Sequence, residues 1–231
     1  ATQTKRSPGS SIKPLIVYTP GLETGLTPES TVTDYNVSSF YSIGTKAGGN
    51  KTSLRNAVKQ SLNGCALDVY SKVTPERGMP KLLQMKFTHI SPDDYHMQAA
   101  LGGFTIGTNT YEMVGGYSCL ANDGEFVQPT CITSLLTYEG DELYQEEEPV
   151  RVYDEGAAIQ MQDILKGVVT GGTAAAMNWN AGKYGPLFGK TGTTEVNADG
   201  WFCGSTHEYS VAAWIGAENN KNAGLWGAQT A

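Results

Sequence analysis

The sequence contains no run of about 18 consecutive apolar residues, the length that a membrane-spanning helix needs. It also lacks any C-x-x-C pair, and only three histidines could join its four cysteines in a zinc site. Lys and Arg number 16 against 23 Asp and Glu, which gives a net charge of −7. Nucleic-acid binding depends on neutralising phosphates with Lys and Arg, so the charge argues against a nucleic-acid partner.

The composition that remains is that of a folded protein. The chain has 231 residues, of which 39% are hydrophobic and 17% charged. It shows no internal repeat and no low-complexity tract, so we expect one domain over residues 1–231. It starts with Ala and has no visible signal peptide, which is typical of a mature piece or an excised domain.

The order of hydrophobic patterns predicts a helical body followed by an antiparallel sheet. Residues 20–50 are rich in Gly, Ser and Thr without a clear period, which predicts a long irregular loop. The acidic stretch 140–150 is typical of a solvated loop or hairpin. Helical spacing predicts helices over 10–18, 52–63, 66–73, 109–124 and 155–169. Runs of β-branched and aromatic residues with turn residues between them predict a hairpin over 131–145 and strands over 201–206 and 209–216.

The four cysteines lie in different surroundings. Cys65, Cys119 and Cys203 sit among apolar neighbours, which predicts buried free thiols. Cys119 and Cys131 form the one pairing for which a disulfide is worth testing.

Three short polar motifs stand far apart in the chain. Ser10 and Lys13 form S-x-x-K, Ser61 and Asn63 form S-x-N, and residues 190–193 read K-T-G-T. Ser61 lies 51 residues after Ser10, and the K-T-G-T motif starts 129 residues after Ser61. Each motif occurs once. Any one alone is weak, since it would also fit an ordinary helical turn, a capped helix or an edge strand.

Together the motifs suit acyl transfer by an activated serine. Residues three apart share one face of a helix, so Lys13 can reach the Ser10 hydroxyl. A serine becomes a good nucleophile when a base takes its proton, and a lysine can be that base once its pKa falls. Lys190 could lower that pKa as a neighbouring cation, and a helix N-terminus at Ser10 would favour developing negative charge.

The remaining motif residues receive supporting roles. Ser61 can relay a proton between the lysines and the leaving amine, and Asn63 can hold a substrate amide. The small Gly192 would let a substrate backbone lie against the strand edge. Backbone N–H groups of Ser10 and Thr193 could form an oxyanion hole, where losing one donor typically costs about 10²–10³ in rate.

Longer stretches around these motifs carry a family resemblance. The trio itself occurs in penicillin-binding proteins and class A β-lactamases. "RSPGSSIKPLIVYTPGLETG", "TSLRNAVKQSLN", "LGGFTIGTNTYEMVGGYSCLANDGEFVQPTCI", "DILKGVVTGGTAAA" and "FGKTGTTEVNADGWFCGST" resemble segments of the transpeptidase domain of class A (bifunctional) penicillin-binding proteins of the Gram-positive type. The resemblance implies an α+β (α/β) fold of the penicillin-binding-protein/β-lactamase-like kind, with a helical lobe beside an antiparallel sheet.

The resemblance also implies a function. It suggests a D-Ala-D-Ala transpeptidase in which Ser10 attacks the penultimate D-alanine carbonyl of a peptidoglycan stem peptide. Thr191 and Thr193 would bind the terminal carboxylate, and β-lactam antibiotics would acylate Ser10. The site would face the outside of the bacterial cytoplasmic membrane, with membrane attachment only through an N-terminal anchor of the parent protein. Neither a cofactor nor a metal is implied.

Several features depart from the family pattern. The family has a five-stranded sheet with two strands before the nucleophile helix, whereas nine residues precede Ser10 here, and the chain stops at "GLWGAQTA" where relatives continue into a helix. We therefore expect a fragment, incomplete at both ends, whose open sheet face exposes apolar surface. Gly64 and Cys65, after the S-x-N triplet, and alanines 174–176 are interpreted as tolerable variation.

Three alternatives share parts of the pattern. A class A β-lactamase would add a deacylating glutamate, but the sequence has no E-x-x-L-N pattern and its middle triplet is Ser-Leu-Asn. A D,D-carboxypeptidase would use water as the acceptor, which these motifs do not distinguish from an amine. An inactive or β-lactam-sensing module would keep the fold without the turnover.

Overall fold

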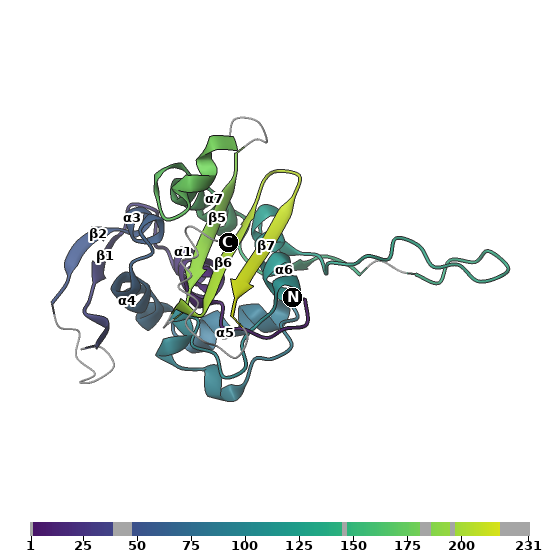
Figure 1. Cartoon of the computed structure of the whole chain (residues 1–231), viewed down its shortest axis with the longest axis horizontal. Coiled ribbons are helices and arrows are strands. Elements are labelled where there is room, and N and C mark those ends of the chain that lie inside the picture. Colours follow the sequence, from purple (N-terminus) through teal and green to yellow (C-terminus); the bar gives the residue numbers. More distant parts are fainter. Residues whose placement is uncertain (1, 39–47, 145–146, 181–185, 195–196, 218–231) are drawn as a thin grey trace.

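The computed structural model describes residues 2–38, 48–144, 147–180, 186–194 and 197–217. Figure 1 shows a helical body that carries a three-stranded sheet on one side, and an arm that extends away from it. The predicted combination of a helical lobe with an antiparallel sheet is confirmed. Every helix in the described ranges is too short or too polar to cross a bilayer.

Within the described residues, the helical lobe contains the five predicted helices, one further α-helix and three short 3₁₀ helices. The first runs further than predicted, as consecutive 3₁₀, π and α turns. The helix predicted over 52–63 ends early, because Ser61 takes a left-handed conformation with φ of 59°. The missed helix begins at Pro75, a residue favoured in a first turn. The elements are η1 (Gly9–Ile12), η2 (Pro14–Tyr18), α1 (Thr19–Glu23), α3 (Leu54–Lys59), α4 (Asn63–Val73), α5 (Pro75–Gln84), η3 (Pro92–Asp94), η4 (Met97–Leu101), α6 (Thr110–Ala121), α7 (Glu155–Gly171) and η5 (Ala175–Asn180).

The main sheet is antiparallel with the order β5 (Phe188–Thr193), β6 (Asp199–Ser205), β7 (Ser210–Gly216). Helix α7 packs against β5, and α6 packs against β6 and β7, so both helices support this sheet (Figure 1). All of β6 is buried. On β7, Val211 and Ile215 are exposed by 45% and 41%, which confirms the expectation of exposed apolar side chains on this sheet.

The predicted irregular loop over 20–50 is wrong in part. It contains strand β1 (Thr31–Asp34), which pairs antiparallel with β2 (Asn50–Ser53), with Val32 opposite Thr52. Val32 is fully buried in the core, whereas the flanking residues are polar and partly exposed. One buried side chain in a four-residue strand leaves no readable alternation, so the pattern could not reveal it.

Gly64 is a packing requirement and not a tolerable variation. A Cβ atom built on Gly64 would lie 2.1 Å from the backbone oxygen of Tyr35, just after β1. The backbone N–H of Thr33 donates to the Asp68 carboxylate on α4 at 3.0 Å, which fixes the same contact. The β1–β2 pair can therefore lie against α4 because residue 64 has no side chain.

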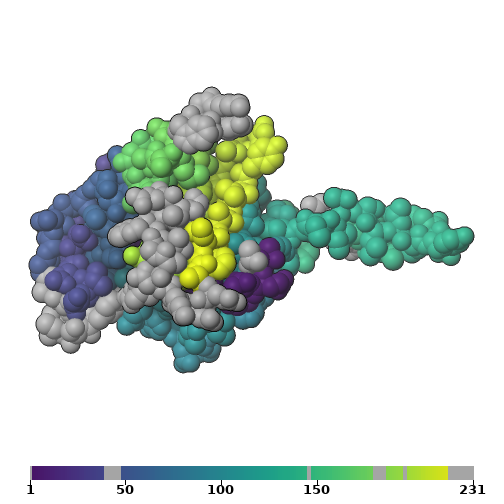
Figure 2. All heavy atoms as spheres, in the orientation of Figure 1, coloured from purple at the N-terminus to yellow at the C-terminus, as the bar shows by residue number. Residues whose placement is uncertain are grey.

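A long exposed arm connects the short strands β3 (Glu125–Phe126) and β4 (Val150–Arg151), which pair with each other. The predicted hairpin over 131–145 is confirmed as far as residue 144, because residue 145 lies outside the described residues. Leu136 forms a bridge with Glu142, and the N–H of Thr137 donates to the Asp141 carbonyl at 2.8 Å. Figure 2 shows residues 130–144 protruding from the body, as expected for an acidic hairpin.

The cysteines are all free. Burial of Cys65, Cys119 and Cys203 confirms their prediction as core thiols. Cys119 and Cys131, the pair that we singled out for testing, form no disulfide, because Cys119 is enclosed by the core on α6 whereas Cys131 is exposed at the start of the arm. Desolvation raises the pKa of Cys119 to about 12, which keeps its thiol protonated.

Replacement of Gly64 by Ala should lower the free energy of unfolding by about 1–3 kcal/mol, the usual cost of overpacking, because the new methyl group meets rigid backbone. The matched control is Gly167→Ala in α7, where a Cβ has no heavy atom within 4 Å. That control should be neutral or stabilising by up to about 1 kcal/mol. Urea unfolding of both variants provides the measurement, and equal stability of Gly64→Ala and wild type would contradict this account.

Candidate functional site

The segment before and after Ser10 is held in place by glycine contacts. Gly9 has a φ of 52°, and a Cβ atom there would lie 2.7 Å from the Thr193 carbonyl oxygen on β5. Gly102 lets its own loop approach within contact of Gly9, because a Cβ at residue 102 would lie 2.4 Å from the Gly9 nitrogen. Ser10 therefore stands in the first helical turn between β5 and the 102 loop, and it remains partly accessible.

Lys13 is fully buried one helical turn after Ser10. Its amine Nζ donates to the Ser61 carbonyl oxygen at 2.9 Å and to Asn63 Oδ1 at 2.5 Å. Desolvation by burial, followed by repulsion from Lys190, holds the pKa of Lys13 well below its ordinary value. In its neutral form the Lys13 amine would use both of its N–H donors in these two bonds and keep its lone pair to accept a proton.

Lys190 approaches the same serine from the sheet. It is fully buried on β5, and its Nζ donates to Ser61 Oγ at 2.8 Å and to the Thr191 carbonyl at 3.1 Å. Desolvation lowers the pKa of Lys190 to about 7. Ser61 thus lies between the two lysines, with its carbonyl on Lys13 and its hydroxyl on Lys190.

The loop between α3 and α4 presents this serine at the cost of backbone strain. Ser53 caps α3 by accepting from the Asn56 N–H at 3.2 Å. Two turns later the chain reverses at Ser61, whose φ of 59° is uncommon for a residue with a side chain. Asn63 starts α4 and is exposed, with its amide directed at the site.

Alternate residues of β5 lie on opposite faces of the sheet. Gly192 shares its face with Lys190, and a Cβ there would lie 2.4 Å from the Pro8 carbonyl oxygen. Its lack of a side chain therefore accommodates the segment before Ser10, which differs from the expected role in receiving a substrate backbone. Thr191 and Thr193 share the opposite face, and Thr191 Oγ1 hydrogen bonds with Thr173 Oγ1 at 2.6 Å.

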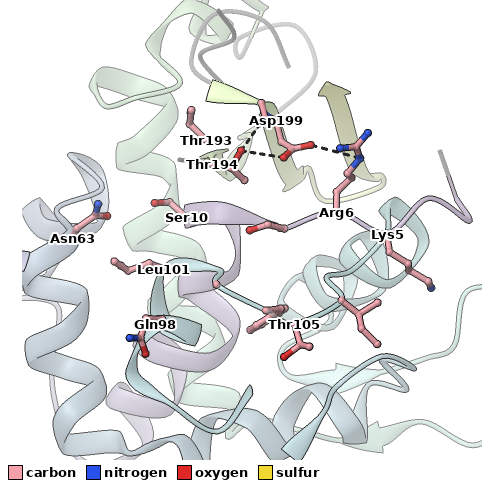
Figure 3. A pocket seen from close by; sticks show the side chains of 15 residues that line it. Lys5, Arg6, Ser10, Asn63, Gln98, Leu101, Thr105, Thr193, Thr194 and Asp199 are labelled. Carbon is pink, nitrogen blue, oxygen red and sulfur yellow. Dashed lines mark hydrogen bonds and ion pairs between the residues drawn. The ribbon is translucent and has the colours of Figure 1, made fainter. Parts of the chain in front are cut away.

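A cavity of about 520 Å³ is lined by one residue from each motif, Ser10, Asn63 and Thr193. Figure 3 shows the Ser10 side chain directed toward Asn63 across this cavity. Among the described contacts, however, no hydrogen bond joins Ser10 Oγ to Lys13 Nζ or Lys190 Nζ, so the expected direct bond is not formed in this state. Catalytic hydrogen bonds are often long without substrate and tighten when it binds.

Sequence reasoning missed three residues of the site. Thr173 follows α7 and hydrogen bonds with Thr191, and Thr194 and Asp199 line the cavity beyond the K-T-G-T motif. The run "TGGT" that ends at Thr173 and the acidic residue before "GWF" were visible but had no local signature of function. No three His, Cys, Asp or Glu side chains in the described part of the chain lie together so as to hold a metal ion.

Comparisons with known proteins agree on one family. A family model described as "Penicillin binding protein transpeptidase domain" matches residues 1–228. Penicillin-binding protein 4 of Bacillus subtilis (strain 168) is 32% identical over 94% of this chain and 35% of its own length. Penicillin-binding protein 1A of Clostridium acetobutylicum is 31% identical over 96% of this chain and 30% of its own length. The chain thus spans about a third of these curated relatives.

Solved structures share the fold. PonA1 of Mycobacterium tuberculosis in complex with penicillin V superposes with a TM-score of 0.77 at 19% identity, over 99% of this chain and 66% of that one. Penicillin-binding protein 1A of Haemophilus influenzae gives a TM-score of 0.76 at 22% identity, over 95% of this chain and 39% of that one. At these identities the likeness establishes the fold.

Burial of Lys190 makes stability depend on pH. Because its pKa falls from 10.5 to about 7 on folding, the unfolded state binds more protons between these values, and the free energy of unfolding rises with pH there. The variant Lys190→Met loses this dependence, so its stability relative to wild type should fall as pH rises from about 7 to about 10. Urea unfolding at several pH values measures this difference.

The exposed Lys51 on β2 offers the control, since Lys51→Met should leave a difference that is constant with pH. A constant difference for Lys190→Met as well would show that Lys190 titrates alike in the folded and unfolded states, contrary to its burial.

Proposed function

The chain belongs to the penicillin binding protein transpeptidase domain family, and we propose that it is a serine-type D-Ala-D-Ala transpeptidase that crosslinks peptidoglycan stem peptides. The observation that carries this proposal is the meeting of Lys13 and Lys190 at Ser61, beside a cavity that Ser10 lines. A buried lysine with a free lone pair, placed one helical turn from an accessible serine, suits activation of that serine.

In the proposed acylation step, Ser10 Oγ attacks the carbonyl carbon of the penultimate D-alanine. The hydroxyl proton passes to the lone pair of Lys13, and the negative carbonyl oxygen is bound by the backbone N–H groups of Ser10 and Thr193. Collapse of the intermediate breaks the bond to the terminal D-alanine. Its nitrogen takes a proton through Ser61, which hydrogen bonds to Lys190.

The other motif residues hold the donor peptide. Asn63 binds a backbone amide of the donor, and the hydroxyls of Thr191 and Thr193 bind the terminal carboxylate. The bond from Thr173 to Thr191 fixes one of these hydroxyls before substrate arrives. An amine of a second stem peptide then attacks the acyl carbon of the ester, and the new amide bond forms the crosslink as the bond to Ser10 Oγ breaks. The amine passes a proton through Ser61 to Lys190, and Lys13 returns its proton to Ser10 Oγ.

The same geometry explains acylation by β-lactams, which imitate the terminal dipeptide and remain as esters on Ser10. The solved complex of PonA1 with penicillin V, which shares this fold, supports that part of the proposal. The proposed place of action is the outer face of the bacterial cytoplasmic membrane, where the parent protein would be anchored.

Ser10→Ala should abolish covalent labelling by a fluorescent penicillin, because the acylated oxygen is removed. The control Ser71→Ala, on α4 away from the cavity, should label like wild type. Intact-protein mass spectrometry and gel fluorescence measure the adduct. Persistent labelling of Ser10→Ala would place the nucleophile elsewhere, and folded wild type without label would favour the inactive module.

The acceptor separates a transpeptidase from a D,D-carboxypeptidase. With a donor peptide ending in D-Ala-D-Ala and a stem-peptide amine in excess, we expect the amide product to exceed the hydrolysed donor. Mass spectrometry of the products gives the ratio. Hydrolysis alone would favour the carboxypeptidase, and rapid loss of the penicillin adduct would favour a β-lactamase.

A further inference from the structure

A buried carboxylate stands at the far wall of the cavity, away from the lysines. Asp199 begins β6, lines the cavity and is only 4% exposed. Figure 3 shows its two oxygens contacting different neighbours, Thr194 on one side and Arg6 on the other. Arg6 lies in the segment that precedes Ser10, and Thr194 directly follows Thr193.

One oxygen of Asp199 faces the segment that leads to Ser10. Oδ1 accepts from Trp214 Nε1 at 2.9 Å and lies 3.8 Å from Arg6 Nε. The Arg6 guanidinium also lies 5.1 Å from the centre of the Trp214 ring and donates to the Ala217 carbonyl at 2.9 Å. Because the Arg6 side chain is 12% exposed, its charge needs a partner, and Asp199 supplies one.

The other oxygen faces the strand end that carries Thr193. Oδ2 accepts from Thr194 Oγ1 at 3.0 Å, and the Asp199 N–H donates back to Thr194 Oγ1 at 3.0 Å. The Thr194 N–H donates to the Asp199 carbonyl at 3.2 Å. Three hydrogen bonds thus fix the residue directly after Thr193.

We propose that Asp199 is a positioning residue that sets the relative placement of Ser10 and Thr193, whose backbone N–H groups form the proposed oxyanion hole. Asp199 contacts the segment before Ser10 through its ion pair with Arg6, and it contacts the end of β5 after Thr193 through its hydrogen bonds with Thr194. This inference rests on the proposed function. A carboxylate is required because one oxygen accepts from the Thr194 hydroxyl while the other faces a buried guanidinium.

Acylation kinetics test the placement. In Asp199→Asn and Thr194→Val, the acylation rate constant at saturating penicillin should fall about tenfold, less than the 10²–10³ for losing an oxyanion donor outright. The dissociation constant of the non-covalent complex should stay within about twofold, because Asp199 acts through Thr194 and does not hold the ligand. The double variant should be no slower than Asp199→Asn alone, since the two residues act as one unit.

The control is Asp163→Asn, which removes an exposed carboxylate that pairs with Arg55 on the helical lobe and should leave both constants unchanged. A weaker dissociation constant with an unchanged rate constant would make Asp199 a ligand contact and overturn the proposal. Multiplying effects in the double variant would overturn it too, because the residues would then act separately.

Amide hydrogen exchange tests, without any catalysis, whether Asp199 holds the end of β5 in place. The Thr193 and Thr194 amides should exchange about tenfold faster in Asp199→Asn and Thr194→Val than in wild type, and at the wild-type rate in Asp163→Asn. Unchanged exchange rates of these amides in both variants would refute the proposal that Asp199 positions this strand end. If wild type takes no penicillin label, the proposed function fails, and exchange still decides whether Asp199 holds these amides.

Discussion

Two lysines buried at one serine impose the main constraint on this structure. Lys13 and Lys190 are both fully enclosed, and both bond to Ser61. Burial penalises the charged form of each amine, and the nearby charge of Lys190 lowers the pKa of Lys13 further. The protein accepts this electrostatic cost at the position where a neutral amine next to a serine is chemically useful.

Contact between backbones makes that meeting possible. The nucleophile segment, the α3–α4 loop and β5 come from distant parts of the chain, and they approach one another at glycine residues, which have no side chain. Gly9 and Gly192 bring the first segment against β5, and Gly64 lets the β1–β2 pair support the start of α4. A methyl group at any of these glycines would separate elements whose polar groups must lie within a few ångströms.

The site therefore consists of three backbone segments that pack closely together, and their polar side chains meet where the segments come into contact. Thr173, just after α7, hydrogen bonds with Thr191, while Asp199 connects the segment before Ser10 to the end of β5. Such supporting contacts matter for acyl transfer, because the charge that develops on a carbonyl oxygen is stabilised by donors that are already in place. The proposed transpeptidase activity depends on this arrangement.

Much of the local structure was readable from the sequence. Helix α6 begins at the cap Asn109 and ends before Asp123 and Gly124, both with positive φ, and β6 and β7 follow the predicted aromatic and β-branched runs. The strand at Val32 was missed because one buried residue makes no period, whereas the apolar neighbours of Cys119 correctly predicted a buried free thiol.

Capping and periodicity act over a few residues, so the local elements could be predicted from the sequence, and the family resemblance identified the motif residues. Three contacts became apparent in the folded structure alone: Ser61 bonds to both lysines, Gly192 accommodates the nucleophile segment, and Asp199 lies near Arg6. These contacts join residues far apart in the chain. Their formation depends on how closely the elements pack, a property that no short stretch of sequence contains.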